Sequence, residues 1–504
     1  MAELKSSYDV VIVGNDLPAL IFGALAAKNG YRVLVLGHGG RPNTYEMDGF
    51  RFVRRPNLLY GFSEAHNIRE VFRDLALLPE MRNMPHPFDP VCDVVLPERR
   101  IELSHVRGII EEEIEREFPG QIGLFSRYFQ DQAELEQRLE PLMKTFPNIP
   151  PAGIMEYFRW SSIRRAIGAA VPPGDALADF DTNPAARAMI AAPVSVLNLC
   201  PDAWKYPLTF SRTTNHLLRG LYNVEWGLDS LKNLFVSRIE GNSGTVRMAE
   251  FADQFDFSRG RVHSIDVRGR NEAVGTSLLV AGTDLAEIAR MLPEKVVRKR
   301  QMQRIHNYAP SHFLVTMNIG MARRGIPTGM ARTVFLVDDP TSPMEGTNCL
   351  TLQVDPAMEP ADMMDPERTT LSVSGMIPAS LLDEGAGSIE AFGEQMIEKV
   401  RAFMPFLDRH LITTSLAATR ISEKTGRSVP DAAGMIPACT RMYPRTFGMI
   451  GQPVRTPWKN IFNLGDATVG TMGFEGAFAV AGMAFNLIKK MLPKKDDFSH
   501  SRGI

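Results

Sequence analysis

An apolar segment that ends at a glycine and is followed at once by an apolar helix lies near the start of this chain. Tyr8–Val13 has the short, continuously hydrophobic pattern of a buried strand, and Gly14 closes it. Leu17–Lys28 has the length and composition of a buried helix, and Tyr31–Leu36 is typical of a second strand. A strand, a tight turn, a helix and a strand within about 30 residues form the βαβ unit that binds dinucleotides. The segment therefore predicts a parallel sheet that carries helices and a dinucleotide site.

The turn between the first strand and the helix departs from the dinucleotide fingerprint G-x-G-x-x-G/A. Gly14 allows the sharp turn, Leu17 opens the helix and Ala19 is small enough for close packing, but Asp16 replaces the middle glycine. A carboxylate at that position opposes the two phosphates, at a cost on the order of a kcal/mol. The alternative is that Asp16 caps its own helix, for which Asp followed by Pro18 is well suited. We favour the cap, which leaves the phosphate site weakened.

A second departure follows the second strand. An acidic residue normally stands there and hydrogen-bonds the adenosine ribose, whereas this chain has Gly37 and His38. Drift in a protein that no longer holds a dinucleotide explains both departures, and so does a cofactor held by other contacts. This segment alone leaves the two explanations nearly even.

A second glycine-rich turn lies near the C-terminus and is more specific. Asn460–Leu464 is typical of a short strand, and Phe478–Met491 is typical of an apolar helix with several small residues. Gly465 and Asp466 follow the strand directly, and further glycines separate them from the helix. Simple packing of a turn against a helix explains Gly476. It does not readily explain a Gly-Asp pair at a strand end before so many glycines.

This arrangement resembles the second signature of the FAD-binding oxidoreductases of the phytoene desaturase and flavin amine oxidase family. The resemblance implies that Asp466, after Gly465, bonds the ribitol chain of FAD. It places Gly473, Phe474 and Ala477 beside the flavin edge, with the N-terminus of the last helix facing the flavin C2 carbonyl. The positive end of that helix would stabilise charge on a reduced flavin.

The resemblance extends along most of the chain. Gly39-Gly40-Arg41 looks like the start of the family's segment that crosses toward the flavin, which assigns Arg41 to the cofactor site, and Phe251 is the best match to the adenine contact. The crossing segment departs at Arg54-Arg55-Pro56, where relatives have an acidic residue, a glycine and a proline. Arg55 would bring bulk close to the flavin or its phosphates. It could also supply the positive charge that the first turn lacks.

The fold class predicted from these segments is α/β, with an FAD-binding Rossmann-like (three-layer) dinucleotide domain and an inserted α+β substrate domain. The dinucleotide domain is discontinuous, and the substrate or lid domain fills the intervals between its parts. The predicted bounds are 1–75, 222–285 and 450–492 for the dinucleotide domain, 76–221 and 286–449 for the substrate domain, and 493–504 for a tail.

Composition narrows the classes of protein that this chain can belong to. Lys and Arg number 56 and Asp and Glu number 58, and the resulting net charge of −2 argues against a general nucleic-acid binder. The four cysteines form no CxxC pair and the histidines are scattered. Neither a disulfide framework nor a metal site is therefore predicted, and the expected compartment is the reducing cytoplasm. No catalytic pair is evident, so the catalytic residues stay unassigned.

One further segment suggests contact with a membrane surface. Tyr157–Ile167 combines aromatic and aliphatic residues with Arg159, Arg164 and Arg165. Such a helix suits an anionic lipid surface, and many relatives in the resembled family take long apolar substrates from lipid. A core helix whose arginines extend to solvent explains the same pattern, and the sequence favours this explanation. The membrane contact would make the protein peripheral.

The sequence thus predicts an FAD-dependent oxidoreductase, of the desaturase, dehydrogenase or isomerase type, with an apolar and isoprenoid or carotenoid-like substrate. The alternative is a flavin-free binding or scaffold protein of the same fold, as in the Rab GDP-dissociation inhibitors, which works with a protein partner or as a homo-oligomer. The Gly-Asp motif favours the flavoprotein.

Overall fold

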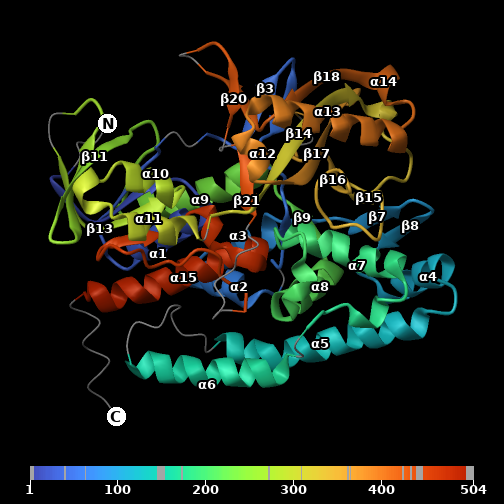
Figure 1. Ribbon diagram of the computed structural model, residues 1–504, viewed down its shortest axis with the longest axis horizontal. Coiled ribbons are helices and arrows are strands. Elements are labelled where there is room, and N and C mark those ends of the chain that lie inside the picture. Colours follow the sequence, from blue (N-terminus) through green and yellow to red (C-terminus); the bar gives the residue numbers. More distant parts are fainter. Residues whose placement is uncertain are drawn as a thin grey trace.

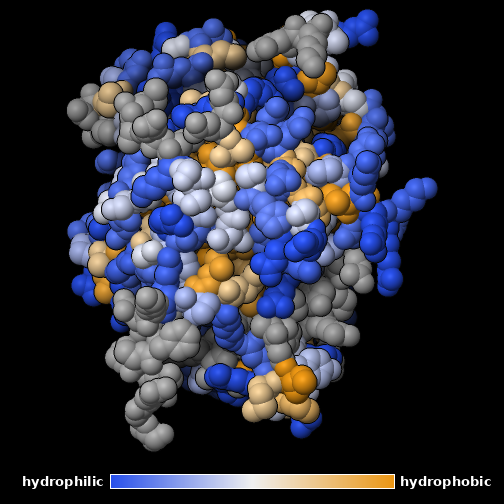
Figure 2. All heavy atoms as spheres, turned by 90° about the vertical axis from the view of Figure 1, so that its left-hand side faces the viewer, coloured by the Kyte–Doolittle hydropathy of each residue, from blue (hydrophilic) through white to orange (hydrophobic). Residues whose placement is uncertain are grey.

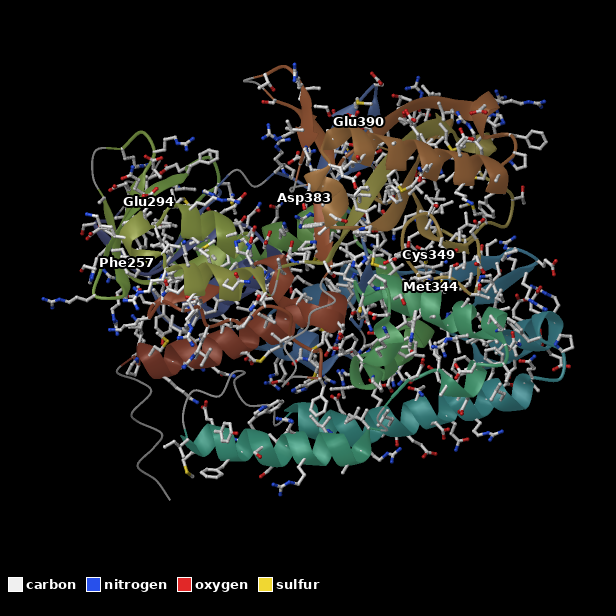
Figure 3. The ribbon with its side chains drawn as sticks, in the orientation of Figure 1. Phe257, Glu294, Met344, Cys349, Asp383 and Glu390 are labelled. Atoms are coloured by element: carbon white, nitrogen blue, oxygen red, sulfur yellow. The ribbon has the colours of Figure 1, made fainter. Side chains whose placement is uncertain are left out.

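The computed structural model describes the chain except for residues 1–4, 39–40, 63, 145–153, 172–173, 271–272, 308, 360–362, 364, 423–424, 432–433, 439–446 and 495–504. Gly39 and Gly40 of the predicted crossing segment lie outside the described residues. The chain forms two lobes, each built on one large sheet (Figure 1). Phe257 and Glu294 lie in the first lobe, and Met344, Cys349 and Glu390 lie in the second (Figure 3).

The first lobe contains the predicted dinucleotide-type sheet. Five of its strands are parallel, in the order β10-β2-β1-β13-β22, and they come from three distant parts of the chain. An antiparallel pair, β11 and β12, continues the sheet from β13. The strands are β1 (Ser7–Gly14), β2 (Val33–Leu36), β10 (Thr245–Arg247), β11 (Ala252–Ser258), β12 (Arg261–Val267), β13 (Val274–Gly282) and β22 (Ile461–Asn463).

Three helices pack together beside this sheet. Helix α1 (Leu17–Lys28) has the predicted bounds and contacts both α9 (Gly227–Gly241) and α15 (Gly473–Met491). Every residue of α1 except Lys28 is buried, as expected for a helix that is apolar on all sides. The βαβ unit predicted from the sequence is therefore confirmed.

The last helix is longer than predicted. It begins at Gly473 rather than Phe478, because two short 3₁₀ turns at 466–468 and 470–472 take up the glycine-rich segment before it. The segment Gly470–Met491 is, within the described chain, the one helical stretch whose length and apolar composition match a membrane span, and 83% of its most apolar window is buried in the protein. We therefore interpret it as a core helix.

The second lobe is built on a mostly antiparallel sheet with two unlike faces. Its order is β18-β14-β17-β16-β15-β7-β8, with β21 also paired to β14. Alternate residues of β14, Val315 and Ile319 among them, pack in an apolar cluster with α13 (Ala386–Phe403), whereas Thr316 and Asn318 are buried on the opposite face. The strands are β7 (Cys92–Leu96), β8 (Arg99–Leu103), β14 (His312–Ala322), β15 (Thr333–Val337), β16 (Cys349–Val354), β17 (Arg368–Pro378), β18 (Leu411–Leu416) and β21 (Met435–Ala438).

A helical layer completes the second lobe, at the lower side of Figure 1. It contains α5 (Ile122–Lys144), α6 (Ile154–Ala170), α7 (Pro184–Leu197) and α8 (Pro207–Arg219). The shorter helices are α2 (His66–Asp74), α3 (Leu78–Asn83), α4 (Arg107–Glu117), α10 (Leu285–Arg290), α11 (Lys299–His306), α12 (Ser380–Asp383) and α14 (Leu407–His410). The short strands are β3 (Thr44–Met47), β4 (Phe50–Val53), β5 (Leu59–Tyr60), β6 (His86–Pro87), β9 (Leu221–Asn223), β19 (Thr419–Ile421) and β20 (Ser428–Pro430).

Candidate cofactor site

The two glycine-rich turns, which lie some 450 residues apart in the sequence, meet at one edge of the first sheet. Strands β1 and β22 pair with opposite sides of β13, so their carboxyl ends open on the same edge. Gly14 has a φ of 108°, and a Cβ there would lie 2.2 Å from the carbonyl oxygen of Gly282. A Cβ on Gly282 would in turn lie 2.8 Å from that of Ala19. The outer positions of the first turn thus allow the close packing that the fingerprint predicts.

Asp16 does not cap its own helix, so the favoured interpretation of this residue was wrong. Its side chain makes no hydrogen bond to the first turn of α1. The carboxylate instead accepts a hydrogen bond, 2.9 Å long, from the backbone N–H of Asp466. The physical reason is that the N–H of a buried turn needs an acceptor, whereas the first turn of a helix can offer its N–H groups to solvent or a ligand.

Arg55 reaches the same point from the crossing segment. Its guanidinium donates to Asp466 Oδ2 at 2.5 Å, and the two side chains are 16% and 17% exposed. Burial raises the pKa of Asp16 to about 7, and the neighbouring Asp466 carboxylate raises it too, while Arg55 and Lys232 oppose the shift. We call these three residues the Asp16–Asp466–Arg55 cluster. Two carboxylates share one adjacent guanidinium in it.

The segment that carries Arg55 is extended and is held by amide side chains instead of a neighbouring strand. Each amide accepts from the N–H and donates to the carbonyl of one residue, as a paired strand would. The pairs fall on alternate residues: Asn318 binds Val53, Asn43 binds Arg55 and Gln353 binds Asn57. We call Asn43, Asn318 and Gln353 the amide clamp. Its two bonds to Arg55 are 3.0 and 3.1 Å long.

Asp229 anchors the clamp to the first lobe. Its carboxylate, in the first turn of α9, accepts from the backbone N–H groups of Asn43 and Thr44 at 2.6 and 2.8 Å and from the Thr44 hydroxyl at 2.8 Å. The clamp therefore ties α9 of the first lobe and the polar sheet face of the second lobe to one segment. That segment presents Arg55 to Asp466.

The start of α15 is in close contact with other parts of the chain. Gly473 has a φ of 51°, and a Cβ there would lie 2.0 Å from the carbonyl oxygen of Leu197 and 2.5 Å from the hydroxyl of Tyr60. That hydroxyl donates to the carbonyl oxygen of Met472 at 2.6 Å, and backbone N–H groups of the helix start face its oxygen. Burial raises the pKa of Tyr60, so the phenol stays protonated. A tyrosine hydroxyl thus lies where the resemblance places a flavin carbonyl.

The remaining predicted site residues fall into three groups. Gly465 lies in the turn, where a Cβ would be 2.4 Å from the Thr283 carbonyl oxygen and 3.4 Å from the Asp16 carboxylate. Leu17, Phe474 and Ala477 belong to the hydrophobic core around α1 and α15, where Phe474 packs against Phe62 at 5.4 Å between ring centroids. Arg41 pairs instead with Asp431, and Phe251 lies under the Arg268 guanidinium.

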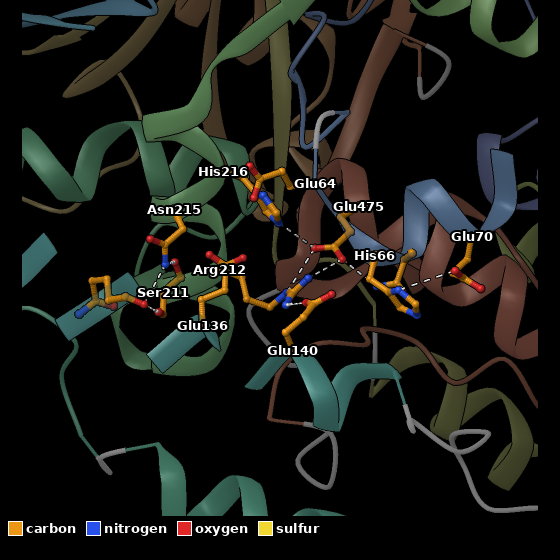
Figure 4. A network of polar contacts seen from close by, with 12 residues as sticks. Glu64, His66, Glu70, Glu136, Glu140, Ser211, Arg212, Asn215, His216 and Glu475 are labelled. Carbon is orange, nitrogen blue, oxygen red and sulfur yellow. Dashed lines mark hydrogen bonds and ion pairs between the residues drawn. The ribbon is translucent and has the colours of Figure 1, made fainter. Parts of the chain in front are cut away.

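A buried ionic network adjoins the start of α15, and the sequence interpretation missed it. Glu475, in the first turn, accepts from Arg212 Nη2 at 2.8 Å and from Asn67 Nδ2 at 2.7 Å, and His216 Nε2 lies 3.5 Å away (Figure 4). Arg212 also reaches Glu140 at 3.3 Å. Burial alone would raise the pKa of Glu475, but Arg212 and then His216 outweigh it and lower that pKa. The i, i+4 spacing of Arg212 and His216 places both on one face of α8, and this spacing is the sequence signal for a shared acidic partner.

Comparisons with known proteins bear on this geometry. No protein-family model matches the chain. The prolycopene isomerase of Daucus carota is 32% identical over 85 residues, which are 16% of this chain and 14% of that protein. Prolycopene isomerase 2 of an Oncidium hybrid cultivar is 29% identical over 90 residues, which are 17% of this chain and 15% of that protein. The chain therefore matches only about one seventh of the length of these curated relatives.

Solved structures match over almost the whole chain. An oxidoreductase from Methanosarcina mazei superposes with a TM-score of 0.58 at 13% identity, covering 95% of this chain and 99% of that one. Putrescine oxidase with bound putrescine superposes with a TM-score of 0.56 at 12% identity, covering 96% of this chain and 99% of that one. The chain has the fold of these oxidoreductases. This confirms the predicted α/β fold class, and it confirms the resemblance to the flavin-dependent oxidoreductases as a likeness of fold.

Among the residues that the structure describes, no group of three or more His, Cys, Asp or Glu side chains is placed to hold a metal ion. The chemistry-bearing groups at the candidate site are those of the Asp16–Asp466–Arg55 cluster and the start of α15. They can bind an anion and a hydrogen-bonding ring.

Proposed function

We propose that the chain is an FAD-dependent oxidoreductase that acts on an apolar substrate of the isoprenoid or carotenoid class. The observation that carries the proposal is the meeting of the two glycine-rich turns, because Asp16 and Asp466 come into contact at the sheet edge where dinucleotides bind in this kind of fold. The likeness of fold to oxidoreductases supports the cofactor. The short similarity to proteins named prolycopene isomerases supports the substrate class.

The described residues fit the diphosphate half of FAD. The uncapped first turn of α1, after Gly14, offers N–H groups and the positive end of a helix to the phosphates. Arg55 would add a cation and Asp466 would bond the ribitol chain. FAD would supply the redox chemistry when bound, while the second lobe would hold the substrate beside it.

At the other half of FAD, the Tyr60 hydroxyl already fills the hydrogen-bonding position at the start of α15. The N–H groups at the start of α15 would therefore bond the Tyr60 hydroxyl and not a flavin carbonyl. We expect Tyr60→Phe to change the absorption maximum of bound flavin without removing it, because the phenol is the nearest hydrogen-bonding group at that end.

The visible spectrum of the purified protein tests the proposal. We expect the purified protein to show the visible absorption of oxidised flavin, or to gain it when FAD is added. Tryptophan or flavin fluorescence measures the binding of the added FAD. Asp466→Ala should weaken FAD binding at least several-fold, since it removes the ribitol contact and the partner of Arg55. Asp383→Ala, an exposed carboxylate on α12 of the second lobe, serves as the control and should bind FAD like the parent. Equal occupancy in all three proteins would dismiss the role of Asp466.

The structure also offers support for the flavin-free alternative. The ion pair between Arg55 and Asp466 and the Tyr60 hydroxyl at α15 already satisfy groups that FAD would contact. A protein that stays colourless with excess FAD would therefore be a binding or scaffold protein, working with a protein partner or as a homo-oligomer. Sedimentation of the purified chain would then establish the oligomer.

For the substrate, incubation with prolycopene in detergent micelles and reduced FAD gives a direct assay. Isomerisation of the polyene, which involves no net redox change, shifts its absorption bands, and chromatography can resolve the products. Unchanged polyene with flavin-loaded protein would reject this substrate class while leaving the flavoprotein intact.

We further propose that the start of α6 rests on an anionic membrane surface. Four of the first five side chains of this helix are large, apolar and exposed: Ile154 at 77%, Met155 at 82%, Tyr157 at 55% and Phe158 at 64%. Figure 2 shows an orange patch bordered by blue at the lower edge of the face toward which this end of α6 points. Only Trp160, Ile163 and Ile167 of α6 are buried, so one face packs and the other is free.

The charges beside the patch favour a lipid surface as its partner. Arg159, Arg164 and Arg165 are exposed on the same helix and would attract acidic headgroups. We expect binding to vesicles that contain phosphatidylserine and loss of that binding in Met155→Ser/Phe158→Ser. Ile421→Ser, at an exposed apolar residue of the second lobe, is the control. Equal sedimentation of all three proteins with vesicles would reject the contact.

A further inference from the structure

The carboxylate of Asp16 lies beside donor groups of the kind that bind a phosphate. It accepts from the backbone N–H of Asp466, it adjoins the uncapped N-terminus of α1, and the Arg55 guanidinium contacts the neighbouring Asp466 carboxylate. Backbone N–H groups at a helix N-terminus together with an arginine are the donors that a diphosphate uses. Asp16 thus supplies, from within the chain, an oxygen anion like the one that a phosphate would bring.

We propose that Asp16 competes with the diphosphate of a bound dinucleotide and that the chain takes up one proton on Asp16 when that ligand binds. The inference rests on the proposed function for the identity of the ligand, but it concerns this chain's own residues. Asp16, at the middle position of the first turn, would then act as a gate, which means that the ligand binds only when this carboxyl is protonated. The proton comes from solvent.

The charges around Asp16 explain the competition. Asp466 faces it from the turn after β22, Arg55 from the crossing segment and Lys232 from α9. With Asp16 ionised, two carboxylates balance two cations, and an incoming diphosphate meets no net positive charge. With Asp16 protonated, one positive charge remains for the diphosphate. Burial raises the pKa of Asp16 to about 7, so both forms are populated near neutral pH and the gate works in that range.

Several segments of the chain hold the groups around Asp16 in place, which is not expected of a binding site that has been lost. The amide clamp fixes Arg55 through both of its backbone groups. Gly465 lets the second turn approach the end of β13, since a Cβ there would lie 2.4 Å from the carbonyl oxygen of Thr283. A residue left over from a lost site would not need three separate segments to support it.

Binding as a function of pH tests the gate. The two probes are FAD and ADP-ribose, because both carry a diphosphate that stays fully ionised across the range, and ADP-ribose lacks the flavin. For the parent protein we expect the Kd of each probe to rise about tenfold between pH 6 and pH 8, as one protonation requires. Calorimetry in two buffers of different ionisation enthalpy should show close to one proton taken up per ligand at pH 8.

Two variants and a control isolate Asp16. Asp16→Asn should remove the pH dependence and the proton uptake, and Asp16→Gly should bind tightly at both pH values. Asp253→Asn, an exposed carboxylate on β11 of the same lobe, should keep the parent's profile. Thermal melting of each variant confirms that it folds, and the two Asp16 substitutions guard against failure of either one.

The outcomes separate the inference from the proposed function. A flat profile of FAD affinity in the parent protein overturns the gate and leaves the flavoprotein standing. A gated ADP-ribose profile without FAD binding supports the gate and rejects FAD as the cofactor. If neither probe binds any of the proteins at pH 6, the gate is overturned, because the protonated form should accept a diphosphate.

Discussion

Two carboxylates stand at the starts of two neighbouring helices, and their surroundings shift their pKa values in opposite directions. Asp16 precedes α1 and its pKa is raised, whereas Glu475 lies in the first turn of α15 and its pKa is lowered. Burial raises the pKa of both carboxyls, so burial does not decide the difference. Glu475 has Arg212, His216 and Asn67 as partners, while Asp16 has one N–H and faces another carboxylate. The charge state of an enclosed acid follows from its donors.

The comparison also separates two roles. The Glu475 network satisfies its charges within the protein and therefore works as a fixed support for α15. The Asp16–Asp466–Arg55 cluster leaves one carboxylate poorly compensated and can respond to a ligand or a proton. Three predictions test this contrast.

The largest expected effect is at Glu475. Glu475→Gln leaves the buried Arg212 guanidinium without its main partner, and loss of one member of such a pair costs about 3–5 kcal/mol of unfolding free energy. Urea denaturation measures this loss. The double variant Glu475→Gln/Arg212→Met should recover part of it, because no unpaired charge remains. A loss below about 1 kcal/mol in the single variant would show that the network contributes little.

The second prediction concerns Asp16 and has the opposite sign. Its pKa is higher in the folded state, about 7, than the unfolded value of about 3.9, so the folded chain binds more protons between these values. The contribution of Asp16 to stability therefore falls as the pH rises from about 4 to 7. Asp16→Asn should be more stable than the parent by roughly 2–4 kcal/mol at pH 8, and nearly equal to it at pH 4.

Thermal melting of both proteins at pH 4, 6 and 8 measures that difference. Other groups titrate over the same range, but they do so in both proteins and cancel in the comparison. A difference between the two proteins that does not change with pH would contradict the raised pKa of Asp16.

The third and smallest effect is at the amide clamp. Asn43→Ala removes the two hydrogen bonds that Asn43 makes to the N–H and the carbonyl of Arg55, at a cost of about 1–3 kcal/mol. Because Arg55 then holds Asp466 less firmly, we expect the Asp16 carboxyl pKa to rise further, which carbon-detected NMR can follow. Asn486→Ala, at an exposed position of α15, is the matched control. An unchanged Asp16 titration in Asn43→Ala would show that the clamp does not set the charges of the cluster.

Much of the first lobe could be predicted from the sequence because its signals are local. The βαβ unit follows from continuous apolar runs around Gly14, and α1 was predicted with its observed bounds. The sequence also predicts a short strand directly before Gly465 and Asp466, and β22 lies there. These features depend on residues that are neighbours in the chain, where periodicity and turn chemistry act.

The details of the site could not be predicted because they depend on contacts between distant segments. A local rule favoured Asp16 as a cap, but the N–H of Asp466, 450 positions away, took its carboxylate. No pattern within one segment relates Asn43, Asn318 and Gln353, since they come together only when both lobes are formed. No feature of the sequence around Tyr60 relates it to the start of α15, because its hydroxyl bonds Met472 only in the folded chain.

The amide clamp has a mechanical consequence for the whole molecule. Asn318 and Gln353 belong to the sheet of the second lobe. Asn43 is hydrogen-bonded to Asp229 of the first lobe. A hinge rotation between the two lobes would have to break the four hydrogen bonds that Asn318 and Gln353 make to the segment carrying Arg55, or it would move Arg55 away from Asp466. A rotation that keeps the bonds of Asn318 and Gln353 would therefore separate the Arg55–Asp466 ion pair, so the relative position of the two lobes is coupled to the charges of the cluster.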